Sequence, residues 1–200
     1  MKKVYLDNAS TTAMRPEVIQ VMVDCMAQDY GNPSSTHSLG RHAKSILELS
    51  RKSIAKALNA TAQEILFTSG GTEANNWILR SAVKDLKVRR IISSKMEHHA
   101  VLYPILELQK EFDIQVEYVE NSADGVLDLT HLVDLLSEST EKTLVSLMHV
   151  NNETGVVLDL ERVSQICQEH HALFHSDTVQ SVGKAILDLR QQFVTMTADQ

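Results

Sequence analysis

The chain has 200 residues, of which 43% are hydrophobic and 22% charged, and its formal net charge is -7 at pH 7. This composition is typical of a globular protein, and the acidic balance argues against nucleic acid as a partner, because phosphate-backbone binders carry a basic face. No apolar run is long enough to cross a membrane, the first residues lack a signal-peptide core, and only two cysteines occur, so we expect a cytoplasmic protein without disulfides or a membrane partner.

The first forty residues are expected to be largely irregular around one helix. Segments 8–12 and 30–37 are small and polar, which is typical of loops. A helix is predicted to start at Arg15–Glu17, because proline suits a first helical turn. Its apolar face comprises Val18, Val21, Met22 and Cys25. A second helical pattern runs from residue 38 to about residue 58.

Further along the chain, short apolar runs alternate with helical patterns. Strands are predicted at 64–68, 90–94, 114–119, 144–149 and 172–176. Helices are predicted at 72–86, 98–112, 129–136 and 160–170. Such alternation indicates parallel βαβ units, so we predict a three-layer α/β/α fold with a mostly parallel sheet. We divide the chain into an N-terminal segment with loops, 1–40, and an α/β domain, 41–200.

The segment 67–76, FTSGGTEANN, predicts a phosphate-binding turn between a strand and a helix. Gly70 and Gly71 allow the backbone to turn tightly and to approach a ligand closely. Thr72 stands where the helix begins, so free N–H groups and the positive end of the helix dipole point outward together. Many strand-to-helix turns look alike, so this turn alone is weak evidence.

Other polar residues follow the predicted strands, at the edge of the sheet where ligands of such folds bind. The set fits pyridoxal phosphate. Asp177 would keep the ring nitrogen protonated, and the His98 imidazole would stack on the ring. Asn152 and Gln180 are candidate donors to the phenolic oxygen. A nicotinamide site is not expected, because the chain has no Gly-x-Gly-x-x-Gly turn.

Each of these residues also has a simpler interpretation. His98 alone is more typical of a polar helix start, Asn152 of a turn, and Asp177 of a cap. His98 and His99 have no helical i, i+4 partner and no Cys/His cluster, so no metal site is expected. Pyridoxal phosphate is favoured because four such features fall at consecutive predicted strand ends.

With these residues in place, the whole chain resembles the N-terminal part of a cysteine desulfurase of the NifS/IscS type. These enzymes belong to the class-V aminotransferase group of fold-type I pyridoxal-phosphate enzymes. The matching motifs are YLDNASTT at 5–12, GNPSS at 31–35, FTSGGTEANN at 67–76, EH at 97–98, MHVNNETG at 148–155 and DTVQSVGK at 177–184. The resemblance implies the large domain of that fold, incomplete at its C-terminal end and without the small C-terminal domain.

The resemblance also implies roles for residues at matching positions. Gly71 and Thr72 would hold the cofactor phosphate. His98 would stack on the pyridine ring and take part in proton transfers. Asn152 would position cofactor and substrate, and Asp177 would pair with the ring nitrogen.

By the same resemblance, Gln180 would donate a hydrogen bond to the phenolic oxygen of the cofactor. In the family reaction, L-cysteine is converted to L-alanine while an enzyme cysteine takes the sulfur as a persulfide. The sulfur then passes to sulfur-acceptor or iron–sulfur scaffold proteins. Family members are homodimers, and the loops at 8–12 and 32–35 would lie close to the interface, so a homodimer is expected for the complete enzyme.

Two groups of the family have no match in this sequence. An ungapped alignment ends at Gln200, a few residues before the Schiff-base lysine, whereas a small deletion places Gln200 at that position. Lys184 is not that lysine, and neither Cys25 nor Cys167 matches the persulfide cysteine; both cysteines are expected to be small buried residues. We therefore expect this chain itself to be inactive.

Two alternatives stay open. Another class-V enzyme, either a selenocysteine lyase or an aminotransferase, would share the cofactor site but act on a different substrate. A non-catalytic fragment would bind a partner or the cofactor phosphate without catalysing a reaction.

Overall fold

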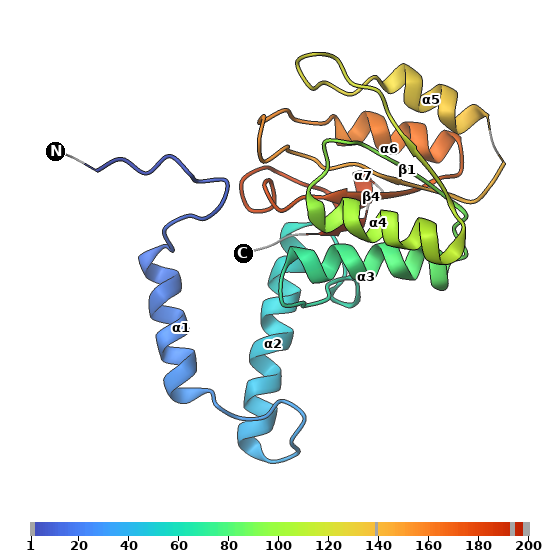
Figure 1. Ribbon diagram of the computed structural model, residues 1–200. Helices are drawn as coiled ribbons and strands as arrows, with labels where there is room; N and C mark the ends of the chain where they lie inside the picture. The colour runs from blue at the N-terminus through green and yellow to red at the C-terminus, as the bar shows by residue number, and fades with distance from the viewer. Residues whose placement is uncertain (1–2, 139, 193–194, 198–200) are drawn as a thin grey trace. The chain divides into compact units, whose positions relative to one another are not determined.

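The computed structural model describes residues 3–138, 140–192 and 195–197 (Figure 1). The chain divides into two compact units, Met1–Leu66 and Phe67–Gln200. This division falls later than the boundary drawn after residue 40, because helix α2 (Ser38–Ala57) runs unbroken beyond that position. In the described ranges, no helix is both long and apolar enough to cross a membrane.

The first unit contains α1 (Pro16–Gln28), α2 and a short 3-10 helix, η1 (Ala62–Glu64). Helix α1 starts at a proline, as the sequence predicts. It buries none of its residues, so the prediction that Cys25 is buried is wrong for this structure. The reason is that an apolar helical face is buried only where another element packs on it.

The second polar loop of this unit packs closely against the start of α2. A Cβ atom on Gly31 would lie 2.3 Å from the carbonyl oxygen of Leu39, and one on Gly40 would lie 2.4 Å from that of Ser35. The ring of His37 caps α2 by accepting a hydrogen bond from the Gly40 N–H at 3.4 Å. Glycine is required at both positions because the two backbone segments touch.

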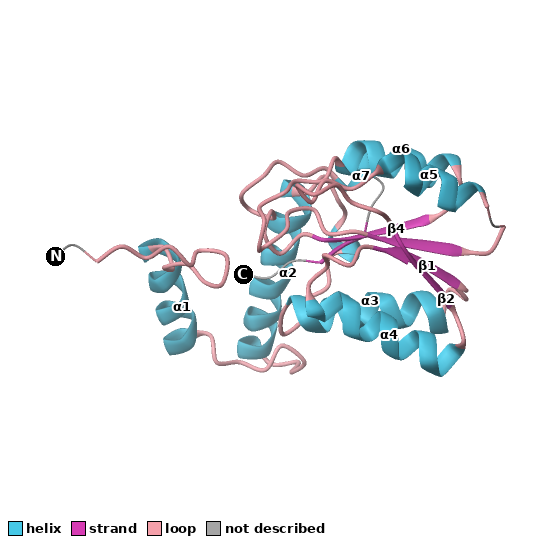
Figure 2. Cartoon of the chain, turned by 45° about the horizontal axis from the view of Figure 1, so that its top comes forward, coloured by secondary structure: helices cyan, strands magenta, loops and turns pink. Residues whose placement is uncertain are grey.

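The second unit is a three-layer α/β/α structure, which confirms the predicted fold class. In the described part, five parallel strands lie in the order β2-β1-β3-β4-β5. The strands are β1 (Arg90–Ser93), β2 (Gln115–Tyr118), β3 (Thr143–Ser146), β4 (Leu173–Asp177) and β5 (Thr195–Thr197). The helices are α3 (Gly71–Lys84), α4 (His99–Phe112), α5 (Leu129–Ser137), α6 (Leu160–Glu169) and α7 (Leu189–Gln192). Helices α3 and α4 cover one face of the sheet, and α5 and α6 cover the other (Figure 2).

The main hydrophobic core joins the sheet to the layer formed by α3 and α4. Strands β1 and β3 are buried along their whole length, as is typical of parallel strands covered on both faces. The core cluster consists of Leu79, Ala82, Val83, Val88, Ile91, Val101, Ile105, Leu108, Ile114 and Leu144. This packing fixes the carboxyl ends of the central strands along one edge, where the loops with the predicted site residues begin.

Two differences from the predicted elements lie before α3 and after β4. The strand predicted at 64–68 is wrong: residues 62–64 form η1, and 65–68 pair with none of the strands of the described sheet. A strand needs a partner for its ladder of hydrogen bonds, and an apolar run does not supply one. Beyond the last predicted strand, β5 pairs with β4. Gln200 lies outside the described residues.

Candidate functional site

The turn that the sequence predicts to bind phosphate lies at the start of α3, although residues 65–68 before it belong to none of the strands of the described sheet. Helix α3 begins at Gly71 with Gly70 as its N-cap, and Thr72 is exposed in the first turn. The first helical hydrogen bond runs from the Ala74 N–H to the Gly70 carbonyl at 3.1 Å. The N–H groups of residues 71–73 therefore precede the helical ladder, which is the arrangement that suits an anion.

A carboxylate of the same helix shapes this turn. Glu73 accepts hydrogen bonds from the Ser69 N–H at 2.6 Å and from the Ser69 hydroxyl at 2.8 Å. These two bonds lower the pKa of Glu73 below its usual range. The side chain thus reaches back over the helix start in the manner of a capping box and restrains the residues before Gly71.

Asp177 ends β4, and its carboxylate is held by two donors. The side-chain amide of Asn75 donates to Oδ2 at 2.8 Å, and the Val179 N–H donates to Oδ1 at 3.1 Å. Asp177 is buried, and Asn75 is fully buried on α3, four residues after Gly71. The structure therefore places an oriented, buried carboxylate beside the helix that starts at the phosphate turn.

His98 is the N-cap of α4 and is exposed. Its Nδ1 accepts a hydrogen bond from the Ala100 N–H at 3.2 Å, so the proton of the neutral ring lies on Nε2. The His98 ring centroid lies 5.8 Å from that of His99, which in turn stacks on Tyr103 at 4.9 Å. The predicted imidazole is thus anchored through one nitrogen, with a flat face and an Nε2–H group left for a ligand.

The two amide candidates lie on the loops after β3 and β4. Asn152 is half-buried, and its Nδ2 donates to Glu153 Oε1 at 3.2 Å. Gln180 is half-buried in the turn after Asp177, which is closed by a bond of 2.9 Å from the Ser181 N–H to the Thr178 carbonyl. The fold therefore brings both segments to the same edge of the sheet as Asp177.

The loops after β3 and β4 are joined directly. The His149 N–H donates to the Asp177 carbonyl at 3.0 Å, which continues the strand pairing past the end of β3. His149 Nδ1 lies 2.9 Å from the Ser181 hydroxyl, and burial lowers the pKa of this imidazole. These contacts restrain the segment that leads to Asn152 against the turn that carries Gln180.

The loops after β1 and β3 are joined by two further bonds. The Met148 N–H donates to Glu97 Oε1 at 2.9 Å, and the Asn151 amide donates to the Met96 carbonyl at 2.9 Å. Burial raises the pKa of Glu97 to about 8, and the charge of Asp177 contributes to the rise. His98 follows Glu97 directly, so these bonds hold the segment that presents the imidazole.

Three of these side chains were not predicted from the sequence. Asn75 lies one helical turn after Gly71 and on its face, which is the pattern that could have identified it. Glu97 follows a buried strand directly, but a single carboxylate at a strand end does not predict a partner. Asn151 stands next to the predicted Asn152, and its Oδ1 accepts from the N–H groups of Glu153 and Thr154, which form the turn.

The two cysteines differ in their surroundings. Cys167 on α6 is buried, and burial raises the pKa of its thiol to about 12. Cys25 on α1 is exposed. Burial is therefore confirmed for Cys167 only. The thiol of Cys167 stays protonated and cannot act as a nucleophile in the folded unit.

The chain is similar to known proteins over nearly its whole length. The family model described as aminotransferase class-V matches residues 4–198. The chain is 41% identical over 184 residues to a cysteine desulfurase IscS of Dictyoglomus turgidum, which covers 91% of this chain and 46% of the relative. The chain spans about half the length of the curated relatives it matches.

Two solved structures are similar to the whole chain. A NifS-like protein matches with a TM-score of 0.90 and 36% identity, over 96% of this chain and 53% of that chain. SspA in complex with cysteine matches with a TM-score of 0.88 and 28% identity, over 98% of this chain and 56% of that chain.

Proposed function

Because the chain belongs to the class-V aminotransferase family, as its motifs predict, we propose that it forms a pyridoxal-phosphate site for cysteine desulfuration. Its relatives include proteins named cysteine desulfurase IscS, and one similar structure is a complex with cysteine. The observation that carries the proposal is the buried Asp177 carboxylate, oriented by Asn75 and by the Val179 N–H. When bound, pyridoxal phosphate would supply an electron sink, which requires a carboxylate at its ring nitrogen.

The residues that would hold the cofactor lie at the strand ends. Gly71 and Thr72 would bind the phosphate at the N-terminus of α3, where the donor set of backbone N–H groups and a hydroxyl suits an anion. His98 would stack on the ring, and its Nε2 is the nitrogen left for proton transfers, because Nδ1 accepts from the Ala100 N–H. Asn152 and Gln180 would contact the phenolic oxygen or the substrate from the loops after β3 and β4.

We further propose that this chain binds the cofactor without turning over L-cysteine. Desulfuration needs a thiolate to accept the sulfur, and the buried thiol of Cys167, with a pKa of about 12, cannot supply one. Cys25 lies in α1 and does not match the family's nucleophile in sequence. A homodimer, sulfur-acceptor or iron–sulfur scaffold partners and a cytoplasmic location stay predictions.

Equilibrium dialysis of the purified chain with pyridoxal phosphate tests the site. We expect saturable binding that Asp177→Asn weakens by about tenfold or more, because a bond to a charged group is lost at the ring nitrogen. Pyridoxal without phosphate should bind more weakly than the phosphorylated compound. Binding that is absent, or that is equal in the wild type and Asp177→Asn, would contradict the proposed site.

Borohydride reduction of the loaded chain, followed by peptide mass mapping, tests the inactivity separately. We expect no stable adduct at a defined lysine and no L-alanine release from L-cysteine. One specific lysine adduct together with L-alanine would show that the chain is active and would leave the cofactor site itself standing.

A further inference from the structure

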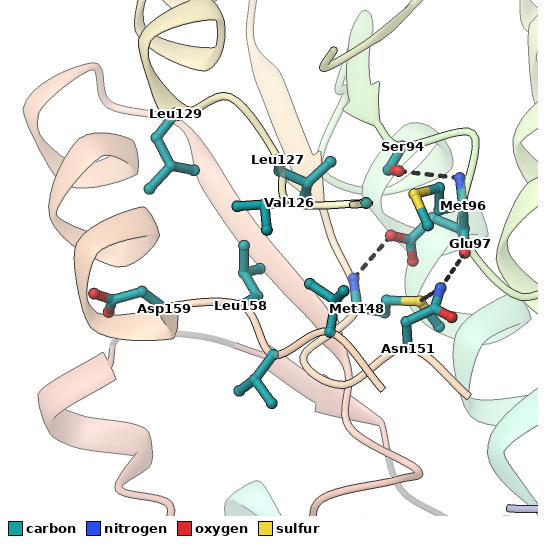
Figure 3. Close-up of a pocket in the computed structure, with 13 residues that line it drawn as sticks. Ser94, Met96, Glu97, Val126, Leu127, Leu129, Met148, Asn151, Leu158 and Asp159 are labelled. Carbon is teal, nitrogen blue, oxygen red and sulfur yellow. Dashed lines mark hydrogen bonds between the residues drawn. The ribbon is translucent and has the colours of Figure 1, made fainter. Parts of the chain in front are cut away.

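A cavity of about 160 Å³ lies beside the loops after β1 and β3, apart from the six residues assigned to the cofactor (Figure 3). Three segments form it: residues 94–97, residues 125–129 and residues 148–159. Most of the side chains around it are apolar, among them Val126, Leu127, Leu129, Met148, Val156 and Leu158. An apolar cavity of about 150 Å³ accommodates a molecule the size of benzene, so the space suits a body of about six heavy atoms.

One polar group in this cavity is buried and incompletely bonded. Glu97 lines the cavity and is 6% exposed. Its Oε1 accepts from the Met148 N–H at 2.9 Å, whereas its buried Oε2 has no hydrogen-bond partner among the residues that the structure describes. A buried polar atom without a partner is costly, and a ligand that donates to it removes that cost.

The remaining polar groups around the cavity indicate which charge a ligand would carry. The second carboxylate is that of Asp159, whose Oδ1 accepts from the Arg162 N–H at the start of α6. The amide of Asn151 is engaged with the Met96 carbonyl, and the Ser94 hydroxyl accepts from the Met96 N–H. No Lys, Arg or His stands among the residues found to line the cavity. Two carboxyl groups without a basic neighbour disfavour an anion and favour a cation.

We propose that this cavity is a binding site for a small aliphatic amine, whose ammonium group donates to Glu97 Oε2 while its hydrocarbon body fills the apolar part. Figure 3 shows the matching division of the cavity: Val126, Leu127 and Leu158 lie on one side, and Glu97 and Asn151 on the other. Val126 and Val157 are 56% and 64% exposed, so the cavity is reached from solvent past these two side chains. This site does not depend on the proposed cofactor function.

Binding of the amine should release one proton, and this release would identify Glu97 as the group that the amine contacts. Burial keeps Glu97 protonated at neutral pH, because its pKa is raised to about 8. An ammonium ion that enters beside Oε2 stabilises the carboxylate, so Glu97 releases its proton to the buffer as the amine binds. The charge that acts on Glu97 in the free chain is that of Asp177, which raises its pKa, and Asp159 is the other carboxyl group among the lining residues.

The test uses the full chain with ¹³C-methyl methionine and 3-methylbutylamine as the probe. Met96 and Met148 line the cavity, whereas Met22 on α1 is exposed and serves as an internal control. We expect saturable shifts of the Met96 and Met148 methyl signals, and none of Met22. The carboxylate 3-methylbutanoate should bind at least about tenfold more weakly than the amine, because no basic side chain among the lining residues can pair with its charge. Calorimetry in two buffers of different ionisation enthalpy should detect proton release.

A matched variant isolates the carboxyl group. Glu97→Gln keeps the volume and an acceptor for the Met148 N–H but cannot become charged. We expect it to lose about tenfold in affinity for the amine and to bind the neutral 3-methylbutan-1-ol as the wild type does. Unmoved Met96 and Met148 signals in the wild type, or equal affinities for amine and carboxylate, would overturn the proposal. These two measurements on the wild type test the proposal even if the Glu97→Gln variant does not fold.

Discussion

The Asn75 side chain donates a hydrogen bond of 2.8 Å to Asp177 Oδ2, although the two residues lie 102 positions apart in the sequence. Both are buried, and the bond joins α3 to the carboxyl end of β4. The helix that starts at the phosphate turn therefore also orients the carboxylate proposed to face the ring nitrogen. One rigid element thus sets the positions of both ends of the proposed cofactor.

Replacement of Asn75 by alanine should destabilise the second unit. Removal of the amide leaves the buried Asp177 oxygen without this donor, which costs about 1–3 kcal/mol. Chemical denaturation monitored by circular dichroism measures the loss. Asn76→Ala is the matched control, because its amide bonds the Thr72 carbonyl at an exposed position. Equal losses in the two variants would contradict a special role for Asn75.

The turn before α3 should depend on Glu73. Glu73→Ala removes the bonds to Ser69, so the residues before Gly71 lose a restraint and the proposed phosphate site becomes less ordered. We expect the affinity for pyridoxal phosphate to fall by about threefold to tenfold, with a smaller change for pyridoxal. Glu73→Gln retains an acceptor and should lie between alanine and the wild type. An equal loss of affinity for pyridoxal phosphate and pyridoxal would show that Glu73 does not act through the phosphate site.

Glu97 should make the unit less stable as the pH rises. Its pKa is raised from 4.5 to about 8 in the folded state, so the folded chain holds a proton that the unfolded chain has lost. The stabilisation is complete below about pH 4.5 and is lost progressively up to about pH 8. The total change is on the order of a few kcal/mol. The measurement is the free energy of unfolding against pH for the wild type and Glu97→Gln, and identical slopes in this window would contradict the assignment.

His175 should make the unit less stable as the pH falls, which is the opposite of the effect of Glu97. Burial lowers its pKa from 6.5 to about 4, so the unfolded chain binds a proton in this range while the folded chain does not. Stability that is present above pH 6.5 is therefore lost as the pH falls towards 4. His175→Gln should flatten this part of the profile, and replacement of the exposed His99 is the control. Because Glu97 acts in the opposite direction over much of this range, the test is the difference between the two profiles, and equal slopes for the wild type and His175→Gln between pH 4 and 6.5 would disprove the effect.

The two thiols should react in separate phases. Cys25 is exposed and should react rapidly with a thiol reagent, whereas the buried thiol of Cys167, with a pKa of about 12, should react only after unfolding. Spectrophotometric counting with and without denaturant distinguishes the phases, and Cys25→Ser should remove the fast one. Two rapidly reacting thiols in the native chain would show that α6 does not bury Cys167 in solution.

Several features could be predicted because their causes are local in the sequence. The apolar periodicity of residues 98–112 and 160–170 indicated α4 and α6, and the buried runs at 90–94 and 144–149 indicated β1 and β3. The glycines before Thr72 indicated the start of α3 to within one residue. The same logic failed at residues 64–68, because an apolar run does not supply a neighbouring strand.

By itself, the sequence determined the order of strands and helices from α3 to β4, the class of the fold and the motifs at the strand ends, since these depend on neighbouring residues. Only the tertiary structure decided that Asn75 bonds Asp177, that Glu97 bonds the Met148 N–H, and that Cys25 is exposed. These outcomes depend on which surfaces meet once the helices pack on the sheet. Periodicity predicts that a side chain faces inward, but the partner it meets there is set by crossovers between strands far apart in the chain.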